Sequence, residues 1–351
     1  RFSFVIHEDD VQYIASELSG TSQMIKAARA IQRSNLSAII AEFDYLVFRS
    51  LKAVGRDFPD VLVPNEEKIE VGILRSGKSF EEWQSDRIQE AVEGKLRESH
   101  KKIVEWVLTE VAGLQDLSPV LKSPFFKEFL EICQRRHLLI HNGGTVNADY
   151  LKHCLEAGIK EESLPALGET LDVDSLYLRR SAARVYLIGA FTMYLVAQNA
   201  YPGHKTIAHR MLLSASHDFL HAGMTKMASR LIEFAEFNSK AFDQDLKLKF
   251  GINKALAKLF EPNVDEATQT KNAGEVLANY DWSVTTPVFD LALTCVKRDF
   301  TKLIPLAKAA YTAGLTYREV RYYVVFKEAR EREGFMECFP KSNLLIEDKS
   351  N

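Results

Sequence analysis

Glycine and proline are sparse in this chain, and they separate stretches whose apolar residues recur at three- and four-residue spacing. Only 17 glycines and 10 prolines occur among 351 residues. Apolar residues at this spacing fall on one face of an α-helix, whereas a β-sandwich shows alternation and closely spaced turns. Residues 36–54 (LSAIIAEFDYLVFRSLKAV) have the helical spacing, and Asp57 and Pro59 follow as a break. The sequence therefore predicts an all-α fold.

The pattern of helices and turns changes near residue 200, which predicts two domains. Long helices are expected over 82–112, 125–141 and 175–198, the first opened by a capping box at Ser79 and Glu82. After Lys205, short helices alternate with short turns, and the expected helix pairs are 246–260 with 265–280 and 287–297 with 300–313.

Asp265 and Asp299, at equivalent places in the two pairs, are offset by 34 residues, which is the period of tetratricopeptide helix pairs. We expect a helical bundle over 1–200, a helical-repeat (tetratricopeptide-like) domain over 201–340 and a flexible tail over 341–351. An irregular α-domain with coincidental spacing is the alternative for 201–340.

Acidic and basic residues nearly balance, which excludes a general polycation. Lys and Arg number 45 and Asp and Glu 48, a net charge of −3, so any nucleic-acid contact must come from a local patch. The four cysteines form no C-x-x-C pair, which is typical of reduced cytosolic thiols. The longest apolar run, 185–197, is shorter than the ~20 residues that span a bilayer, and no secretory leader opens the sequence. We expect a soluble cytoplasmic protein without a membrane partner.

Arg136 and His141 form an R-x4-H pattern at the end of a predicted helix, before the stop signal Asn142-Gly143-Gly144. Arginine is a permanent cation suited to phosphate oxygens, and histidine exchanges protons near neutral pH. The two suit metal-free cleavage of RNA, in which a 2′-hydroxyl attacks the neighbouring phosphorus. His141 lies in the last helical turn, where the helix dipole favours its protonated form, so we expect it to act as an acid.

The spacing also creates a geometric problem. Five positions leave Arg136 and His141 about 140° apart on an ideal helix, whereas His137 and His141 share a face. Arg136 must reach around the helix, or the site must be assembled from more than one helix, as in a dimer that apposes two copies.

The run Arg136–His141 resembles the R-φ-x3-H motif of HEPN domains, where φ is a polar residue. The similarity covers roughly residues 30–160 and includes the segments Phe43-Asp44, Ser99-His100 through Trp106, Phe129–Ile132, Asn142–Val146 and Tyr150-Leu151. The resemblance implies an up-and-down helical bundle, a homodimer with the motifs meeting at its dyad, and a metal-independent endoribonuclease of the kind used as toxins and in phage defence. It implies Arg136 and His141 as the catalytic pair and His137 as the auxiliary position, where asparagine is commoner.

Further residues near the motif are candidate contacts to an RNA substrate: Arg97, Lys101, Arg135 and Asn142. The basic run around Lys101 is alternatively a solvated helix face, and Arg135 a surface charge. Arg136 and His141 could themselves only cap the last helical carbonyls. Asp44 is either a buried partner for a motif arginine or an ordinary cap.

Two other patterns suggest different chemistry. His217 and His221 have the spacing of two metal ligands but lack an acidic third ligand, so we interpret them as packing or surface histidines and expect no metal. Residues 72–79 (GILRSGKS) match the nucleotide-binding P-loop pattern, but no buried strand precedes them and a charged helix follows, so no cofactor is expected. Two alternative functions therefore stay open: a dimeric, non-enzymatic module whose repeats bind a protein partner, and a P-loop nucleotide hydrolase.

Overall fold

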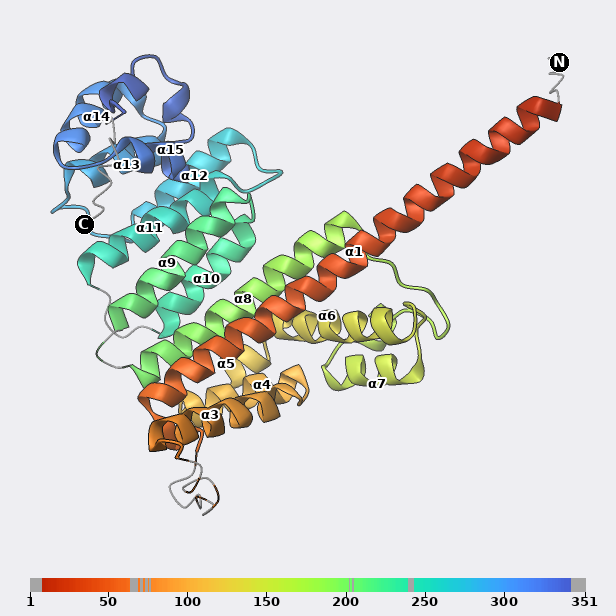
Figure 1. Cartoon of the computed structure of the whole chain (residues 1–351). Helices are drawn as coiled ribbons and strands as arrows, with labels where there is room; N and C mark the ends of the chain where they lie inside the picture. Colours follow the sequence, from red (N-terminus) through yellow and green to blue (C-terminus); the bar gives the residue numbers. More distant parts are fainter. Residues whose placement is uncertain are drawn as a thin grey trace, which may run out of the picture. The chain divides into compact units, whose positions relative to one another are not determined.

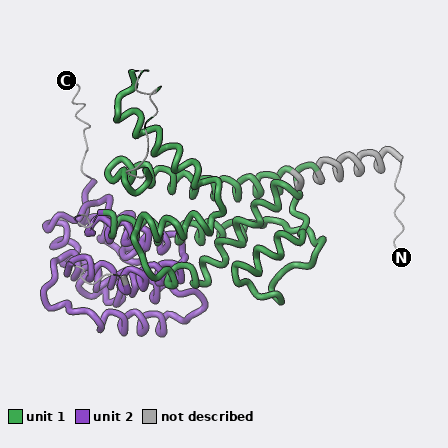
Figure 2. The backbone as a smooth tube through the Cα atoms, turned by 90° about the horizontal axis from the view of Figure 1, so that it is seen from below, with its two compact units in different colours: residues 1–200 green, residues 201–351 purple. Residues whose placement is uncertain are grey.

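The computed structural model describes residues 8–63, 77–201, 205–238 and 243–341, together with the single residues 69, 72, 75 and 203. These residues are all-α, with one isolated backbone bridge between Thr145 and Thr170 and no strand, so the predicted fold class is confirmed. The chain divides into two compact units, residues 1–200 and 201–351 (Figure 2). Of the described helices, none has the length and apolar character needed to cross a membrane. Apart from Lys341, the predicted tail lies outside the described residues.

Unit 1 (residues 1–200) is organised around two long helices, α1 (Glu8–Asp57) and α8 (Ser175–Ala200), which lie side by side (Figure 1). A stripe of α1 is almost fully buried: Leu36, Ile40, Phe43, Val47, Leu51 and Val54. Burial of such a side chain contributes about 1.5–3 kcal/mol, so this stripe anchors α1 in the unit. The other α-helices are α3 (Phe80–Leu96), α4 (His100–Trp106), α5 (Ser118–Leu121), α6 (Pro124–His141) and α7 (Ala148–Glu156).

The prediction of a single long helix over residues 82–112 is wrong. The predicted capping box is present at its start, where Ser79 and Glu82 exchange hydrogen bonds of 2.9 and 3.1 Å. However, α3 ends at Leu96, and the Ser99 hydroxyl accepts a hydrogen bond from the Lys102 amide at 3.4 Å to begin α4. A serine side chain competes for backbone amides in this way and starts a new helix. After α4 a π-helical segment, Val107–Val111, continues the chain.

Unit 2 (residues 201–351) is a succession of shorter helices: α9 (Lys205–His221), α10 (Thr225–Asn238), α11 (Gln244–Leu259), α12 (Glu266–Leu277), α13 (Pro287–Lys297), α14 (Leu303–Thr312) and α15 (Tyr317–Tyr322). Helices adjacent in sequence contact one another, as in α9 with α10 and α11 with α12. The two predicted helix pairs are therefore present, with a 3-10 turn at Phe300–Lys302 opening α14. Whether they form a tetratricopeptide array stays a prediction.

In the P-loop pattern at 72–79, the described residues Lys78 and Ser79 both make contacts with α3. Lys78 forms an ion pair with Asp86, and Ser79 caps α3. Residues 73, 74 and 76 of the pattern lie outside the described residues, and the described residues before it include no strand. A P-loop connects a strand of an α/β fold to a helix, and the described residues are all-α, so they give no support to a nucleotide site here.

Candidate functional site

Helix α6, which carries the motif, is fixed at both ends by local hydrogen bonds. The Ser123 hydroxyl accepts from the Phe126 amide at 3.2 Å and caps the first turn. At the other end, the backbone amides of Asn142 and Gly144 donate to the Leu138 carbonyl oxygen at 2.8 and 3.2 Å. Because these bonds satisfy groups that a helix end leaves free, α6 ends at His141, as the sequence predicts.

Gly144 lets the chain beyond α6 approach the segment that precedes α8. Its φ of +90° is left-handed, and a Cβ here would lie 2.7 Å from the Leu171 carbonyl oxygen. The Leu171 amide donates to the Gly144 carbonyl oxygen at 2.9 Å, and the Val146 amide donates to that of Glu169 at 2.8 Å. Only glycine suits both the angle and the close approach. The pairing leads the chain into α7, which contacts α6.

Glu131 connects α6 to both of its neighbours. Its carboxylate accepts hydrogen bonds from the Tyr150 hydroxyl of α7 at 2.7 Å and the Tyr177 hydroxyl of α8 at 2.8 Å. It also accepts from Arg135 Nε at 2.8 Å, and the Arg135 guanidinium lies over the Tyr177 ring at 4.1 Å. Burial and the Glu131 charge raise the pKa of both phenols, so they stay protonated donors. This network holds α6 in place and occupies Arg135.

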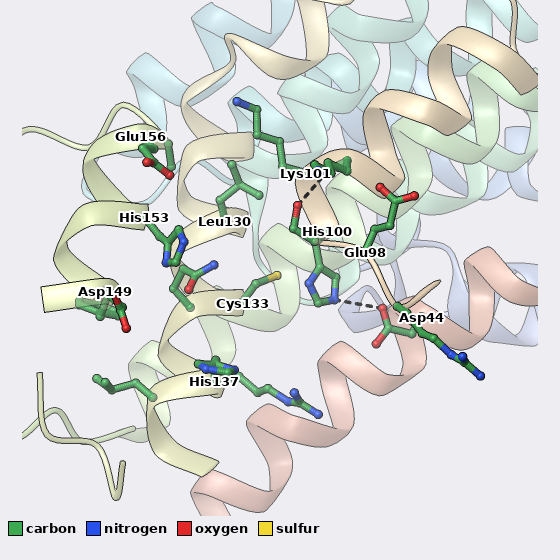
Figure 3. A pocket seen from close by; sticks show the side chains of 18 of the residues that line it. Asp44, Glu98, His100, Lys101, Leu130, Cys133, His137, Asp149, His153 and Glu156 are labelled. Carbon is green, nitrogen blue, oxygen red and sulfur yellow. Dashed lines mark hydrogen bonds and ion pairs between the residues drawn. The ribbon is translucent and has the colours of Figure 1, made fainter. Parts of the chain in front are cut away.

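A cavity of about 810 Å³ lies against the other side of α6 (Figure 3). Its walls come from α1, from the turn before α4 and α4 itself, from α6 and from α7. Much of the lining is charged or titratable: Asp44, Arg97, Glu98, His100, Lys101, Lys102, Glu105, Cys133, Arg136, His137, Asp149, Tyr150, His153 and Glu156. Three imidazoles and one motif arginine thus share a single cavity, a combination suited to proton transfer beside an anion.

Among the residues that the structure describes, Arg136 lines this cavity without a partner for its charge. Its Nε is buried and makes no hydrogen bond within the part of the chain that the structure describes. A buried donor left unpaired costs about 1–3 kcal/mol. An anion bound in the cavity would remove that cost. Arg135, the preceding residue, is the opposite case, since the Glu131 carboxylate already compensates its charge.

His137 and His141 lie one turn apart on α6, with ring centroids 4.5 Å from each other. Desolvation lowers the pKa of His137 from 6.5, and the neighbouring charges of His141 and Arg136 lower it further. His137 is therefore neutral near pH 7. His137 lines the cavity, whereas His141 is exposed at the end of α6 and is not part of the cavity wall. Within one chain, the structure brings Arg136 and His137 together and leaves His141 beside them.

Asp44 pairs with His100, so it has neither of the two roles that the sequence left open. Its Oδ1 lies 3.0 Å from His100 Nε2, and the dashed line in Figure 3 marks this contact. The pair joins α1 to the start of α4. The His100 ring also contacts the rings of Phe43 and Phe129, with centroids 6.2 and 6.0 Å away. Asp44 therefore neither caps a helix nor binds a motif arginine.

The four predicted RNA contacts separate into two groups. Arg97 and Lys101 line the cavity, and Lys101 is half exposed with only a long 3.9 Å contact to Glu105. Arg135 and Asn142 are not part of the wall, because the Glu131 carboxylate holds Arg135 and the Thr145 carbonyl holds Asn142. The structure assigns these last two residues to the framework of α6.

Unit 2 has a cavity of its own, of about 560 Å³, between α9, α11, α13 and the 3-10 segment Val324–Phe326. Its lining is largely apolar: Leu213, Leu246, Ile252, Leu256, Val288, Phe289, Ala292, Val325 and Phe326. His217 lies at this cavity, where its Nε2 accepts a hydrogen bond from the Val324 amide at 3.4 Å and its ring contacts Tyr323. His217 thus has the packing role that the sequence favours for it.

No group of three or more His, Cys, Asp or Glu side chains among the described residues has an arrangement that could hold a metal ion. Comparison of the chain with protein-family models, with curated proteins and with solved structures finds no match.

Proposed function

We propose that this chain is a metal-independent endoribonuclease of the HEPN type, with its active site in the cavity beside α6. The observation that carries the proposal is Arg136, a cation that no described residue pairs with, in the wall of a cavity that three histidines also line. Its position in the R-x4-H pattern, within the longer resemblance of residues 30–160 to HEPN domains, supports the same reading.

The side chains available suit cleavage by the 2′-hydroxyl of RNA. The reaction needs a group that removes the hydroxyl proton, a group that protonates the leaving 5′-oxygen, and a cation for the charge on the phosphoryl oxygens. Arg136 supplies the cation, with a guanidinium that can donate two parallel hydrogen bonds to a phosphate. His141, in the last turn of α6, supplies the proton, and His137 lies beside it as a neutral ring.

Basic residues at the cavity support a polyanionic substrate. Arg97, Lys101 and Lys102 line the wall opposite α6, and all three come from the turn before α4 or from α4. Cations that track a phosphate backbone supply most of the sequence-independent affinity for RNA. Acidic residues such as Glu98 and Glu156 interrupt this surface. Such an arrangement suits a short single-stranded segment better than a long duplex.

A second copy of the chain completes the proposed site. His141 is exposed, and its neighbour Ile140 is an apolar side chain that is 48% exposed. Two α6 ends apposed about a dyad would cover the Ile140 side chains and bring both His141 rings to the two cavities. Homodimerisation through the end of α6 is therefore part of the proposal.

The test is cleavage of a short single-stranded RNA by the full chain in the presence of EDTA. The expected products carry a 2′,3′-cyclic phosphate and a 5′-hydroxyl, and a DNA of the same sequence stays intact because it has no 2′-hydroxyl. His141→Ala should abolish cleavage with an unchanged circular-dichroism spectrum, and His221→Ala, an exposed histidine of unit 2, is the matched control. Cleavage that needs a divalent ion, or full cleavage by His141→Ala, contradicts the proposal.

The alternative is a non-catalytic module in which the helices of unit 2 bind a protein. Its largely apolar cavity beside His217 is the feature that favours this reading. The same experiment separates the two functions. No cleavage by the wild-type chain, together with a partner whose binding survives Arg136→Ala and His141→Ala, would favour the binding module.

A further inference from the structure

The geometry points to His100, oriented by Asp44, as a second catalytic histidine that removes the proton from the attacking 2′-hydroxyl. This inference rests on the proposed function and adds a residue from outside the R-x4-H motif. It also gives the cavity of a single chain a general base that does not depend on the partner copy.

The contact with Asp44 fixes which nitrogen of His100 can act. A carboxylate only accepts hydrogen bonds, so His100 Nε2, 3.0 Å from Asp44 Oδ1, must carry the hydrogen in the neutral ring. The lone pair is then on Nδ1, and Nδ1 makes no hydrogen bond among the described residues. A carboxylate that orients one ring nitrogen leaves the other as a base and stabilises the imidazolium that forms.

The surroundings hold the ring in place without sealing it off. The rings of Phe43 and Phe129 contact that of His100, and the His100 side chain keeps 22% of its surface exposed. His100 and His137 come from different helices, α4 and α6, and both line the cavity (Figure 3). An imidazole held by these contacts and partly exposed at the cavity wall is open to a hydroxyl bound in the cavity, which a general base must reach.

His137 is a weaker candidate for this base. It also lines the cavity, and its lowered pKa keeps it neutral. However, no carboxylate among the described residues orients its ring, and its closest ring neighbour is another imidazole, His141. The tautomer of His137 is therefore not fixed, whereas that of His100 is.

The proton and bond changes balance in one step. His100 Nδ1 takes the 2′-hydroxyl proton, the 2′-oxygen forms a bond to phosphorus, and the bond from phosphorus to the 5′-oxygen breaks. The 5′-oxygen takes a proton from protonated His141, of either copy, and Arg136 offsets the charge on the phosphoryl oxygens. The products are a 2′,3′-cyclic phosphate and a 5′-hydroxyl, and exchange with water returns both histidines to their starting state.

The charged and titratable groups that line the cavity around His100 affect its titration and must stay constant between variants. From α1 the group is Asp44; from the turn and α4 they are Arg97, Glu98, Lys101, Lys102 and Glu105; from α6 they are Cys133, Arg136 and His137; from α7 they are Asp149, Tyr150, His153 and Glu156. His100→Gln changes none of these and keeps a side-chain amide that can donate to Asp44. It removes the ability to exchange a proton and the ring contacts with Phe43 and Phe129, so the fold of this variant is checked by thermal melting.

The experiment is a pH profile of kcat/KM for cleavage of a short RNA in EDTA by the full chain. For the wild type we expect a rate that rises with pH at the acidic end, as the base loses its proton. His100→Gln should lower kcat/KM at pH 7 by about 100-fold or more and remove this rising limb. His100→Ala should be slow but regain activity with added imidazole, and Asp44→Asn should weaken cleavage less than His100→Gln does.

Thermal melting checks that each variant folds, and His221→Ala controls for the loss of an imidazole elsewhere. A wild-type chain that cleaves, loses activity on Arg136→Ala, and keeps its full rate and rising limb in His100→Gln would overturn the role of His100 alone. A wild-type chain that cleaves no RNA at any pH would overturn this role and the proposed function together.

Discussion

The Tyr150 hydroxyl donates a 2.7 Å hydrogen bond to the Glu131 carboxylate and so ties α7 to α6. Tyr150 is 3% exposed, and its own backbone amide is capped by Asn147 at the start of α7. The relationship matters because α6 and α7 form two walls of the cavity. The position of Arg136 on α6 therefore depends on the Glu131 carboxylate, which is not part of the cavity wall.

Replacing Glu131 by Ala should lower the free energy of unfolding of unit 1 by about 3–5 kcal/mol, because the Arg135 charge and two tyrosine hydroxyls lose their acceptor. Urea unfolding followed by tryptophan fluorescence measures this in a Trp282→Phe background, where the remaining tryptophans, Trp83 and Trp106, both lie in unit 1. Glu90→Ala, which breaks an exposed contact with Arg87 in the same unit, should change the free energy by less than about 1 kcal/mol. Equal effects of the two substitutions would contradict the role of Glu131.

Gly144→Ala should destabilise unit 1 more than Gly143→Ala. Both glycines have left-handed backbones, with φ of +90° and +60°, so each alanine costs about 1–2 kcal/mol in strain. Only at Gly144 would the new Cβ also meet the Leu171 carbonyl oxygen, which adds at least about 1 kcal/mol. The same fluorescence assay compares the pair. A larger loss for Gly143→Ala would show that the close approach to Leu171 is not formed in solution.

Unit 2 should lose stability in mild acid because of His209 and His217. Burial lowers the pKa of both imidazoles below 6.5. The negative charges of Asp243, near His209, and Asp218, near His217, act to raise the pKa but do not outweigh burial. Each ring therefore binds its proton more weakly in the folded chain. The free energy of unfolding should be unaffected above pH 6.5 and should fall as the pH drops through 6.5 towards the folded pKa values.

Urea unfolding between pH 7.5 and pH 5.5 measures this loss in a chain whose only tryptophan is Trp282 of unit 2. Replacing both histidines by glutamine should flatten the pH dependence. An unchanged slope in that double variant would assign the acid sensitivity to other groups.

The sequence predicts the parts of this structure that depend on local pattern. The apolar spacing of 36–54 places it within α1, and Asn142-Gly143-Gly144 marks the end of α6 correctly because left-handed glycines have few alternatives. The long helix expected over 82–112 fails at Ser99, since a serine inside a charged stretch gives no clear sign of whether it caps or merely sits on the surface.

The cavity could not be predicted, because its residues are distant in sequence. Asp44 meets His100 only through the packing of α1 against the rest of unit 1, and a single sequence carries no record of that contact. The pairing of Arg135 with Glu131 is compatible with its i, i+4 spacing on a helix, but spacing alone does not distinguish a buried pair from an exposed one. His153, which also lines the cavity, could have been noticed in the sequence, because Asp149 lies one turn before it on α7 and side chains at that spacing can interact.

The most direct test of this account is the rate of RNA cleavage in EDTA by Arg136→Ala, set against Arg318→Ala, which removes an exposed arginine of unit 2. We expect Arg136→Ala to lower kcat by about 100-fold or more, because the charge on the phosphoryl oxygens loses its cation, and Arg318→Ala to cleave at the wild-type rate. Both variants should melt at the wild-type temperature or above it, since Arg136 has no protein partner among the described residues to lose. A folded Arg136→Ala chain that cleaves RNA as fast as the wild type would contradict the assignment of this cavity as the active site.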